Sequence, residues 1–225
     1  HDSGMFGKMK KQQIKRGQFI SLFTSKKRFL KFLYCTLIGV PVWYVIGILV
    51  IFSPEFAKNV FHIEEEINAG KSVMYHYIGA SIGSFIAGWI SQWLHSRKKA
   101  IGIALIALTV FIGVYFVCFN VSSTIFYFII FVLGLAMGYW AVFITTASEQ
   151  FGTNLRATVT TSVPNFVRGS TVPMTFLFLY MGNNASIGLW ASGIIVGTIV
   201  FFLAFYSLFK LEETYNKDLD YMEDI

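Results

Sequence analysis

The residues Thr124–Ser148, TIFYFIIFVLGLAMGYWAVFITTAS, decide the fold class, because this stretch of 25 residues contains no charged side chain. An α-helix of about 20 apolar residues crosses the hydrocarbon core of a bilayer. Lipid offers no hydrogen-bonding partner, so the backbone N–H and C=O groups of a spanning segment must bond to one another. The stretch is too long and too uniformly apolar to be a strand of a membrane barrel. We therefore predict that it forms a membrane-spanning α-helix.

Five further apolar stretches have a similar length, and together the six predict an all-α membrane protein with six transmembrane helices. The chain of 225 residues is 55% hydrophobic and 13% charged. A soluble domain carries about 25% charged residues, so the deficit of charge indicates lipid as the solvent. The predicted spans are Leu30–Phe52, Lys71–Leu94, Ala100–Phe119, Thr124–Ser148, Ala157–Met181 and Ser186–Phe209.

The cations of the chain gather on alternate connections between the spans. Fifteen Lys and Arg residues lie on one side of the predicted membrane, either before or at the start of the first span or after the second, fourth or sixth span. Only Lys58 and Lys71 lie on the opposite side. Cytoplasmic connections carry the excess of Lys and Arg in membrane proteins. Both termini are therefore predicted to be cytoplasmic, in an integral, multi-pass protein of the bacterial inner (plasma) membrane. The net charge of +6 is then a topology signal, and no nucleic-acid partner is expected.

Two cytoplasmic segments flank the predicted six-helix domain of residues 30–209. Residues 1–29 form a basic linker, within which residues 5–28 are either an amphipathic helix on the membrane surface or a solvated segment. Residues 210–225 form a polar and acidic C-terminal tail, which we expect to be a frayed helix end or disordered.

The six spans differ in polarity in a repeating way. The third and sixth carry few bulky polar side chains and are predicted to face lipid, whereas the others line an interior. One bland span in each triplet is typical of a three-plus-three repeat, a common transporter plan. Glycines four residues apart predict close helix packing at Gly79 with Gly83 and at Gly134 with Gly138. The prolines expected to kink their spans are Pro41, Pro164 and Pro173.

Arg168 lies inside a predicted span, about eleven residues and roughly 16 Å along the fifth. A charged side chain at membrane depth is costly and by default marks a functional site. Thr161 and Asn165 fall on the same helix face, so we predict Asn165 and Arg168 to bind substrate. The alternative is that this span begins deeper in the cytosol and Arg168 extends back to the interface.

Two aromatic pairs lie at the middle of spans, away from the interfacial belts where such residues gather. Trp43 and Tyr44 follow Pro41, and Tyr139 and Trp140 follow a glycine. Concave binding sites favour aromatic walls, so the four residues are candidates for substrate binding. Packing in the core is the alternative.

His76 lies in the second span between two tyrosines, about a quarter of the way from the outer side. The ordinary pKa of histidine, about 6.5, suits a proton-coupling group. A histidine in an interfacial aromatic belt is the alternative.

Three charged residues are candidates for gating at the cytoplasmic ends of the spans. Glu149 ends the fourth span and Arg156 opens the fifth, so the two are expected to pair, with Arg97 as a further partner. An exposed pair contributes little stability, about 0–1 kcal/mol, so its expected value is as a contact made in one conformation.

Motifs that would indicate an enzyme are missing from the sequence. It has no zinc motif, no phosphate-binding loop, no nucleophile elbow and no cluster of carboxylates inside the spans. No catalytic residue, metal or cofactor is expected, and an enzyme is the weakest hypothesis.

Two segments resemble conserved signatures of the major facilitator transporters. Gly88–Lys99, GWISQWLHSRKK, is similar to the inner-loop motif of a Gly, three residues, Asp-Arg, Gly and a basic cluster, but Gln92, Trp93 and His95 replace the Asp, the Arg and the second Gly. Ser148–Thr158, SEQFGTNLRAT, resembles the Glu-x-Phe-Pro-Thr-x-x-Arg-Ala-Thr loop of sugar and metabolite:proton symporters, with Gly152 in place of the Pro. The stretch Asn165–Arg168 is similar to their eleventh helix.

The resemblance implies the C-terminal half of such a transporter, helices seven to twelve. The first and fourth spans would then line a central cavity, the second and fifth would contact the N-terminal half, and the third and sixth would face membrane lipid. The implied function is secondary transport of a small polar or anionic solute by alternating access, with proton-coupled symport as an option. A non-transporting membrane protein that acts in interaction or as a scaffold is the alternative.

Overall fold

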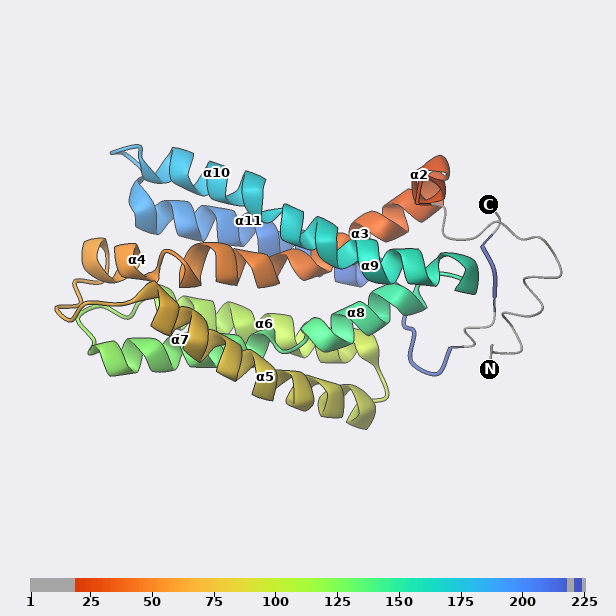
Figure 1. Cartoon of the computed structure of the whole chain (residues 1–225), viewed down its shortest axis with the longest axis horizontal. Helices are drawn as coiled ribbons and strands as arrows, with labels where there is room; N and C mark the ends of the chain where they lie inside the picture. Colours follow the sequence, from red (N-terminus) through yellow and green to blue (C-terminus); the bar gives the residue numbers. More distant parts are fainter. Residues whose placement is uncertain (1–18, 218–220, 224–225) are drawn as a thin grey trace.

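The computed structural model describes residues 19–217 and 221–223, and in this part of the chain every regular element is helical (Figure 1). The helices run along one long axis, as a bundle. Their bounds are α2 (Ser21–Thr24), α3 (Lys26–Tyr44), the π-helix η1 (Val45–Val50), α4 (Ser53–Asn59), α5 (Ala69–Trp93), α6 (Arg97–Phe116), α7 (Ser123–Met137), α8 (Trp140–Glu149), α9 (Thr153–Gly169), α10 (Thr171–Gly182) and α11 (Gly188–Lys210).

These elements make six passes, each at the place of a predicted span: α3 with η1, α5, α6, α7 with α8, α9 with α10, and α11. Four passes in the described residues are long and apolar enough to cross a membrane by themselves: Lys26–Val50, Arg97–Phe116, Ser123–Glu149 and Gly188–Lys210. The pass α5 is long but more polar, and α9 with α10 is interrupted. The first span starts at Lys26, four residues earlier than predicted. We call the end where α3, α6 and α9 begin the basic end.

The passes pack in a reciprocal pattern that confirms the predicted three-plus-three repeat. The first triplet is α3, α5 and α6, and the second is α7 with α8, α9 with α10, and α11. The first pass of each triplet packs against the third pass of the other: α3 against α11, and α7 against α6. It also packs against the second pass of the other: α3 against α9, and α7 against α5.

The closest helix contact is that of α5 with α7, and glycines on both helices make it. A Cβ atom at Gly79 would lie 2.1 Å from the carbonyl oxygen of Phe131, and one at Gly83 would lie 2.1 Å from that of Leu135. On α7, a Cβ atom at Gly134 would lie 2.1 Å from the carbonyl oxygen of His76. The backbones therefore touch over two turns, the close approach that small residues permit in lipid.

Three tyrosines inside the bundle have fully buried rings whose hydroxyls bond to the backbone of a neighbouring pass. Tyr44 donates to the carbonyl oxygen of Gly193 at 2.8 Å, Tyr115 to that of Leu49 at 2.8 Å, and Tyr139 to that of Ile38 at 2.9 Å. A buried hydroxyl without a partner is costly. Each bond therefore fixes the position of one pass along the bundle axis relative to its neighbour.

Three passes are interrupted near the middle of the bundle, and two of the three breaks lie close to a proline that was expected to kink its span. The first pass becomes a π-helix after Tyr44, where the amide of Ile51 bonds to the carbonyl of Ile46. The fourth breaks between α7 and α8 at Gly138 and Tyr139, and the fifth at Ser170 between α9 and α10. Pro41 lies three residues before the first break, and Pro173, which cannot donate to the carbonyl four residues earlier, lies three residues after Ser170. Pro41 and Pro164 lie inside continuous helices.

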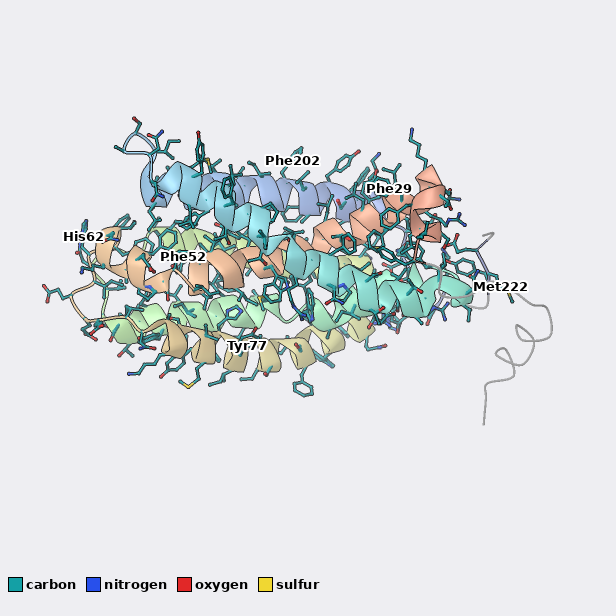
Figure 2. The ribbon with its side chains drawn as sticks, turned by 45° about the horizontal axis from the view of Figure 1, so that its top comes forward. Phe29, Phe52, His62, Tyr77, Phe202 and Met222 are labelled. Carbon is teal, nitrogen blue, oxygen red and sulfur yellow. The ribbon has the colours of Figure 1, made fainter. Side chains whose placement is uncertain are left out.

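The side of the bundle away from these breaks is apolar where it is exposed. Phe202 on α11 is 71% exposed (Figure 2), and Ile106 and Val110 on α6 are each 58% exposed. Phe85 on α5 and Phe176 on α10 are exposed to a similar degree, so it stays a prediction that the third and sixth passes face lipid. Cys35 and Cys118 are both buried and do not form a disulfide.

We predict that Gly83→Ala destabilises the protein by about 1–3 kcal/mol, the usual effect of overpacking, because the new methyl group would meet the backbone of α7. Gly88→Ala on the same helix is the matched control, since a Cβ atom there has no neighbour within 4 Å. Thermal unfolding of both variants in detergent measures the difference. Equal melting temperatures would show that α5 and α7 do not depend on this contact.

Candidate functional site

A cavity of about 290 Å3 lies beside the three breaks, near the middle of four passes. It is open to the outside of the chain, because Tyr77 is 48% exposed on its rim (Figure 2). The first, second, fourth and fifth passes supply its wall, the four that were predicted to line an interior. The lining residues are Val42, Trp43, Ile46, Tyr77, Ala80, Ser81, Ser84, Met137, Trp140 and Arg168.

Arg168 lies in the last turn of α9 and reaches this cavity. It is fifteen residues beyond Thr153, the first residue of α9, which is about 22 Å along the helix. Its guanidinium carbon lies 5.4 Å from the centroid of the Trp43 ring, and Nη1 donates to Oδ1 of Asn165 at 3.5 Å. The stacked cation keeps a donor edge free to bind a further acceptor. The structure therefore places the guanidinium against Trp43 near the middle of the bundle.

Each predicted aromatic pair is divided between the cavity and the core. Trp43 and Trp140 line the cavity. The predicted roles of Tyr44 and Tyr139 in substrate binding do not fit their positions, because both rings are completely buried and their hydroxyls bond to the backbone. The residues of a pair point about 100° apart on a helix, so only one of them can face a given wall. Nε1 of Trp43 is buried without a hydrogen-bond partner.

His76 is buried between α5 and α7 and does not belong to an interfacial belt. Its side chain has no exposed surface, and Nε2 lies 3.1 Å from Sδ of Met137. Met137 lines the cavity, as does Tyr77, the neighbour of His76 in sequence. The imidazole therefore lies behind the cavity wall, one side chain away from the open space.

The polar face of α9 continues from the cavity along the exposed side of the chain. Thr161 and Asn165 are exposed, and the Nδ2 of Asn165 donates to the carbonyl oxygen of Thr161 at 2.9 Å. Phe166, on the next face, is 46% exposed. A face with this polarity at the depth of the spans does not suit lipid.

At the basic end, Glu149 contacts Arg97 across the bundle. Nη2 of Arg97 lies 3.4 Å from Oε1 of Glu149, and Nη1 donates to Oγ of Ser91 at 3.0 Å. The other oxygen of Glu149 accepts from the hydroxyl of Thr214 at 2.6 Å. Nη2 of Arg156, the partner expected first, donates to the carbonyl oxygen of Phe151 at 3.5 Å. The recorded ion pair of Glu149 is thus with Arg97, the second candidate.

The C-terminal tail, expected to be a frayed helix end or disordered, contacts the bundle where the structure describes it. The carboxylate of Glu213 accepts from Oγ of Ser96 and from the backbone amides of Arg97 and Lys98, at 2.9 and 3.2 Å. It therefore caps the N-terminus of α6, where the helix dipole favours an anion. The hydroxyl of Tyr215 donates to Oε1 of Gln92 at 3.0 Å.

A second part of the tail binds the start of α9. The backbone amide of Thr153 donates to the carbonyl oxygen of Tyr221 at 2.8 Å, and the side chain of Asn154 bonds to the backbone of Glu223 in both directions, at 2.9 and 3.0 Å. The carboxylate of Glu223 lies 3.1 Å from Nζ of Lys31. The tail thus joins α3, α6 and α9. Most of the linker of residues 1–29, including residues 5–18, lies outside the described residues.

Sequence reasoning missed which residues of α5 line the cavity, and it missed the contribution of the tail to the basic end. Ser81 and Ser84 both line the cavity, and neither was among the predicted site residues. The glycine face of α5 carried the missing signal, because the adjacent face of a helix packed through glycine must border the same groove. No local pattern marked Glu213 and Thr214, whose partners lie more than 60 residues away.

Residues 6–170 match the family model described as Major Facilitator Superfamily, which covers well over half of the chain. No curated protein and no solved structure was found to match the chain.

We predict that Glu213→Gln loosens the tail from α6. Loss of a cap of this kind lowers stability by about 0.5–2 kcal/mol. The backbone amides of Arg97 and Lys98 are therefore expected to exchange hydrogen roughly 2- to 30-fold faster at neutral pH. Glu212→Gln is the matched control, since its carboxylate bonds to Lys217 and not to α6. Unchanged exchange in Glu213→Gln would contradict the cap.

The same contact predicts a pH dependence. Burial raises the pKa of Glu213, but hydrogen bonds from Ser96 and from the backbone amides of Tyr215, Arg97 and Lys98 outweigh it and hold the pKa below its usual value. A lowered pKa stabilises docking at neutral pH, and this contribution is lost as the pH falls below the usual glutamate pKa and through the lowered one. Spin labels at the exposed positions 99 and 216 should show broader distances in that acidic window, and unchanged distances would oppose the assignment.

Proposed function

Since the chain belongs to the major facilitator superfamily, a family of membrane transporters, we propose that it is the C-terminal six-helix half of a secondary transporter. In this proposal it moves a small polar or anionic solute by alternating access. The observation that carries the proposal is the cavity of about 290 Å3, in which Arg168 is the one charged residue of the wall.

The chemistry of the wall favours a solute rich in acceptors. Arg168 presents a guanidinium, and Trp43 presents a buried Nε1–H that has no acceptor. A guanidinium fork binds carboxylate or phosphate with two parallel hydrogen bonds. Ser81 and Ser84 add hydroxyl groups on the opposite wall. No carboxylate lies among the lining residues to compete for the cation.

The open side of the cavity supports a second half as the partner. The exposed polar face of α9 and the exposed side of α5, which includes Tyr77 and Phe85, flank the cavity. Facing lipid, the charge of Arg168 alone would cost several kcal/mol. An N-terminal half of the same transporter would cover this face and complete the site, as alternating access between two repeats requires.

The basic end is assigned to the cytoplasm in this proposal, and the membrane to the bacterial inner membrane. The pair of Arg97 with Glu149 and the docked tail then close the cytoplasmic side of this half, with Arg156 in the first turn of the neighbouring α9. His76 is the proposed proton-coupling group, because it is the buried histidine of the described residues and contacts Met137 of the cavity wall.

We predict that Arg168→Lys loses roughly 10- to 100-fold in transport efficiency, since a hydrogen bond to a charged group contributes about 1.5–3 kcal/mol. Arg168→Ala should lose nearly all transport. A lysine keeps the charge but not the fork or the stacking on Trp43. Counterflow uptake with a panel of polar and anionic solutes, on the transporter with both halves, measures the loss.

Trp93→Phe is the control for this test, since Trp93 is 69% exposed and does not line the cavity. It should transport normally, and all three variants should insert and melt like the unchanged protein. Normal transport by Arg168→Lys would show that Arg168 is not part of the binding site.

We also predict that this chain alone, in proteoliposomes, shows no saturable uptake, and that co-expression with the N-terminal half restores it. Half of a cavity cannot alternate its access between two sides. Saturable, solute-selective uptake by the chain alone would refute the half-transporter proposal. Failure of the reconstituted pair to transport any solute would favour the scaffold alternative.

A further inference from the structure

We infer that the basic end of the bundle carries a second site, which binds the phosphate of an anionic phospholipid between the start of α3 and the end of α11. This inference does not depend on the proposed transport function. It concerns a separate cavity of about 220 Å3, which lies at the basic end of the bundle and away from the central cavity. Lys27, Lys31 and Lys210 line this cavity, together with Tyr34, Gln150 and Glu212 among others.

Among the described residues, two of the lysines at this cavity make no ion pair. Nζ of Lys31 is 3.1 Å from the carboxylate of Glu223, and Glu212 is 2.7 Å from Nζ of Lys217. Neither Lys27 nor Lys210 takes part in an ion pair recorded among the described residues. The ammonium group of Lys210 lies 5.6 Å from the centroid of the Tyr206 ring.

The one carboxylate of the wall also responds to this positive field. The pKa of Glu212 is lowered, first by its hydrogen bond from Lys217 and by the charge of that residue, and also by the charges of Lys31 and Lys27. Burial acts in the opposite direction but does not prevail. Glu212 is therefore committed to Lys217 as an anion and leaves the cavity with an excess of cations.

The depth of the cavity matches the phosphate level of a membrane. The two spans that border it begin at Lys26 and end at Lys210, so the lysines lie at the ends of the apolar segments. Basic pockets between helices at this level bind anionic headgroups. A free ammonium on a flexible stem binds a phosphate as a point charge, without the fixed geometry that an arginine demands.

The surface beside the cavity suits the acyl chains of the same lipid. Tyr34 lies two turns into α3 from Lys27, with its ring 6.1 Å from that of Tyr206. On the outward face of α11, Phe209 is 79% exposed and Phe202 is 71% exposed (Figure 2). A polar, positive cavity that continues into an apolar helix face favours a lipid over a soluble phosphate, which needs no apolar contact.

The test is native mass spectrometry of the intact protein with phosphatidylglycerol or phosphatidylcholine added to the micelles. We expect phosphatidylglycerol to be retained and phosphatidylcholine to be lost. Each lysine near an anionic lipid contributes roughly a fivefold factor in affinity. The double variant Lys27→Gln with Lys210→Gln should therefore bind phosphatidylglycerol roughly thirtyfold more weakly.

The matched control is Lys58→Gln with Lys71→Gln, two exposed lysines at the other end of the bundle, which should bind like the unchanged protein. A melting temperature equal to that of the control shows that the test variant is folded. For the unchanged protein, retention should also fall as salt is raised. Equal retention of the two lipids, or undiminished binding by Lys27→Gln with Lys210→Gln, would overturn the inference. Displacement of the lipid by glycerol phosphate at similar concentration would overturn it too, in favour of a soluble anion.

Discussion

The backbone contact of α5 with α7 is the constraint on which the other features of the bundle depend. Lipid gives helices no hydrophobic reason to associate, so close packing and a few hydrogen bonds must hold them. At Gly79, Gly83 and Gly134 the carbonyl groups of one helix occupy the space where a side chain of the other would stand. This contact joins the two triplets of the repeat, and it places His76 and Met137 between the helices.

The interruptions in the passes have a related physical role. A spanning helix cannot leave backbone groups unsatisfied in lipid, so irregular backbone is confined to places where protein or an aqueous cavity supplies partners. The π-helix after Tyr44 shows this rule, because the hydroxyl of Tyr115 donates to the carbonyl oxygen of Leu49 within it. Near the same level, the breaks at Tyr139 and Ser170 place Trp140 and Arg168 beside the cavity. The bundle is therefore least regular where its polar groups gather.

The sequence predicted the spans, their grouping into two triplets and the position of Arg168 within a span. These features follow from the hydrophobic stretches and the charges along the chain. The sequence could not predict which residue of each aromatic pair faces the cavity, because that depends on the rotation of a helix about its axis. The rotation is set by distant contacts such as that of Tyr44 with Gly193. The same limit explains the partner of Glu149. Arg156 is nearer in sequence, but the fold brings the start of α6 to that carboxylate.

The tail shows how a feature that is missing from a local motif is supplied from elsewhere in the chain. Gln92, at the end of α5, stands where the motif of the major facilitator transporters has an aspartate. This segment therefore brings no carboxylate of its own to the basic end. Glu213 brings one from the tail to the first amides of α6, and Tyr215 bonds to Gln92. A carboxylate held by a tail is easier to release than one within a short loop, because few buried contacts must break with it. The contacts of the described part of the tail are therefore an integral part of the structure of the basic end.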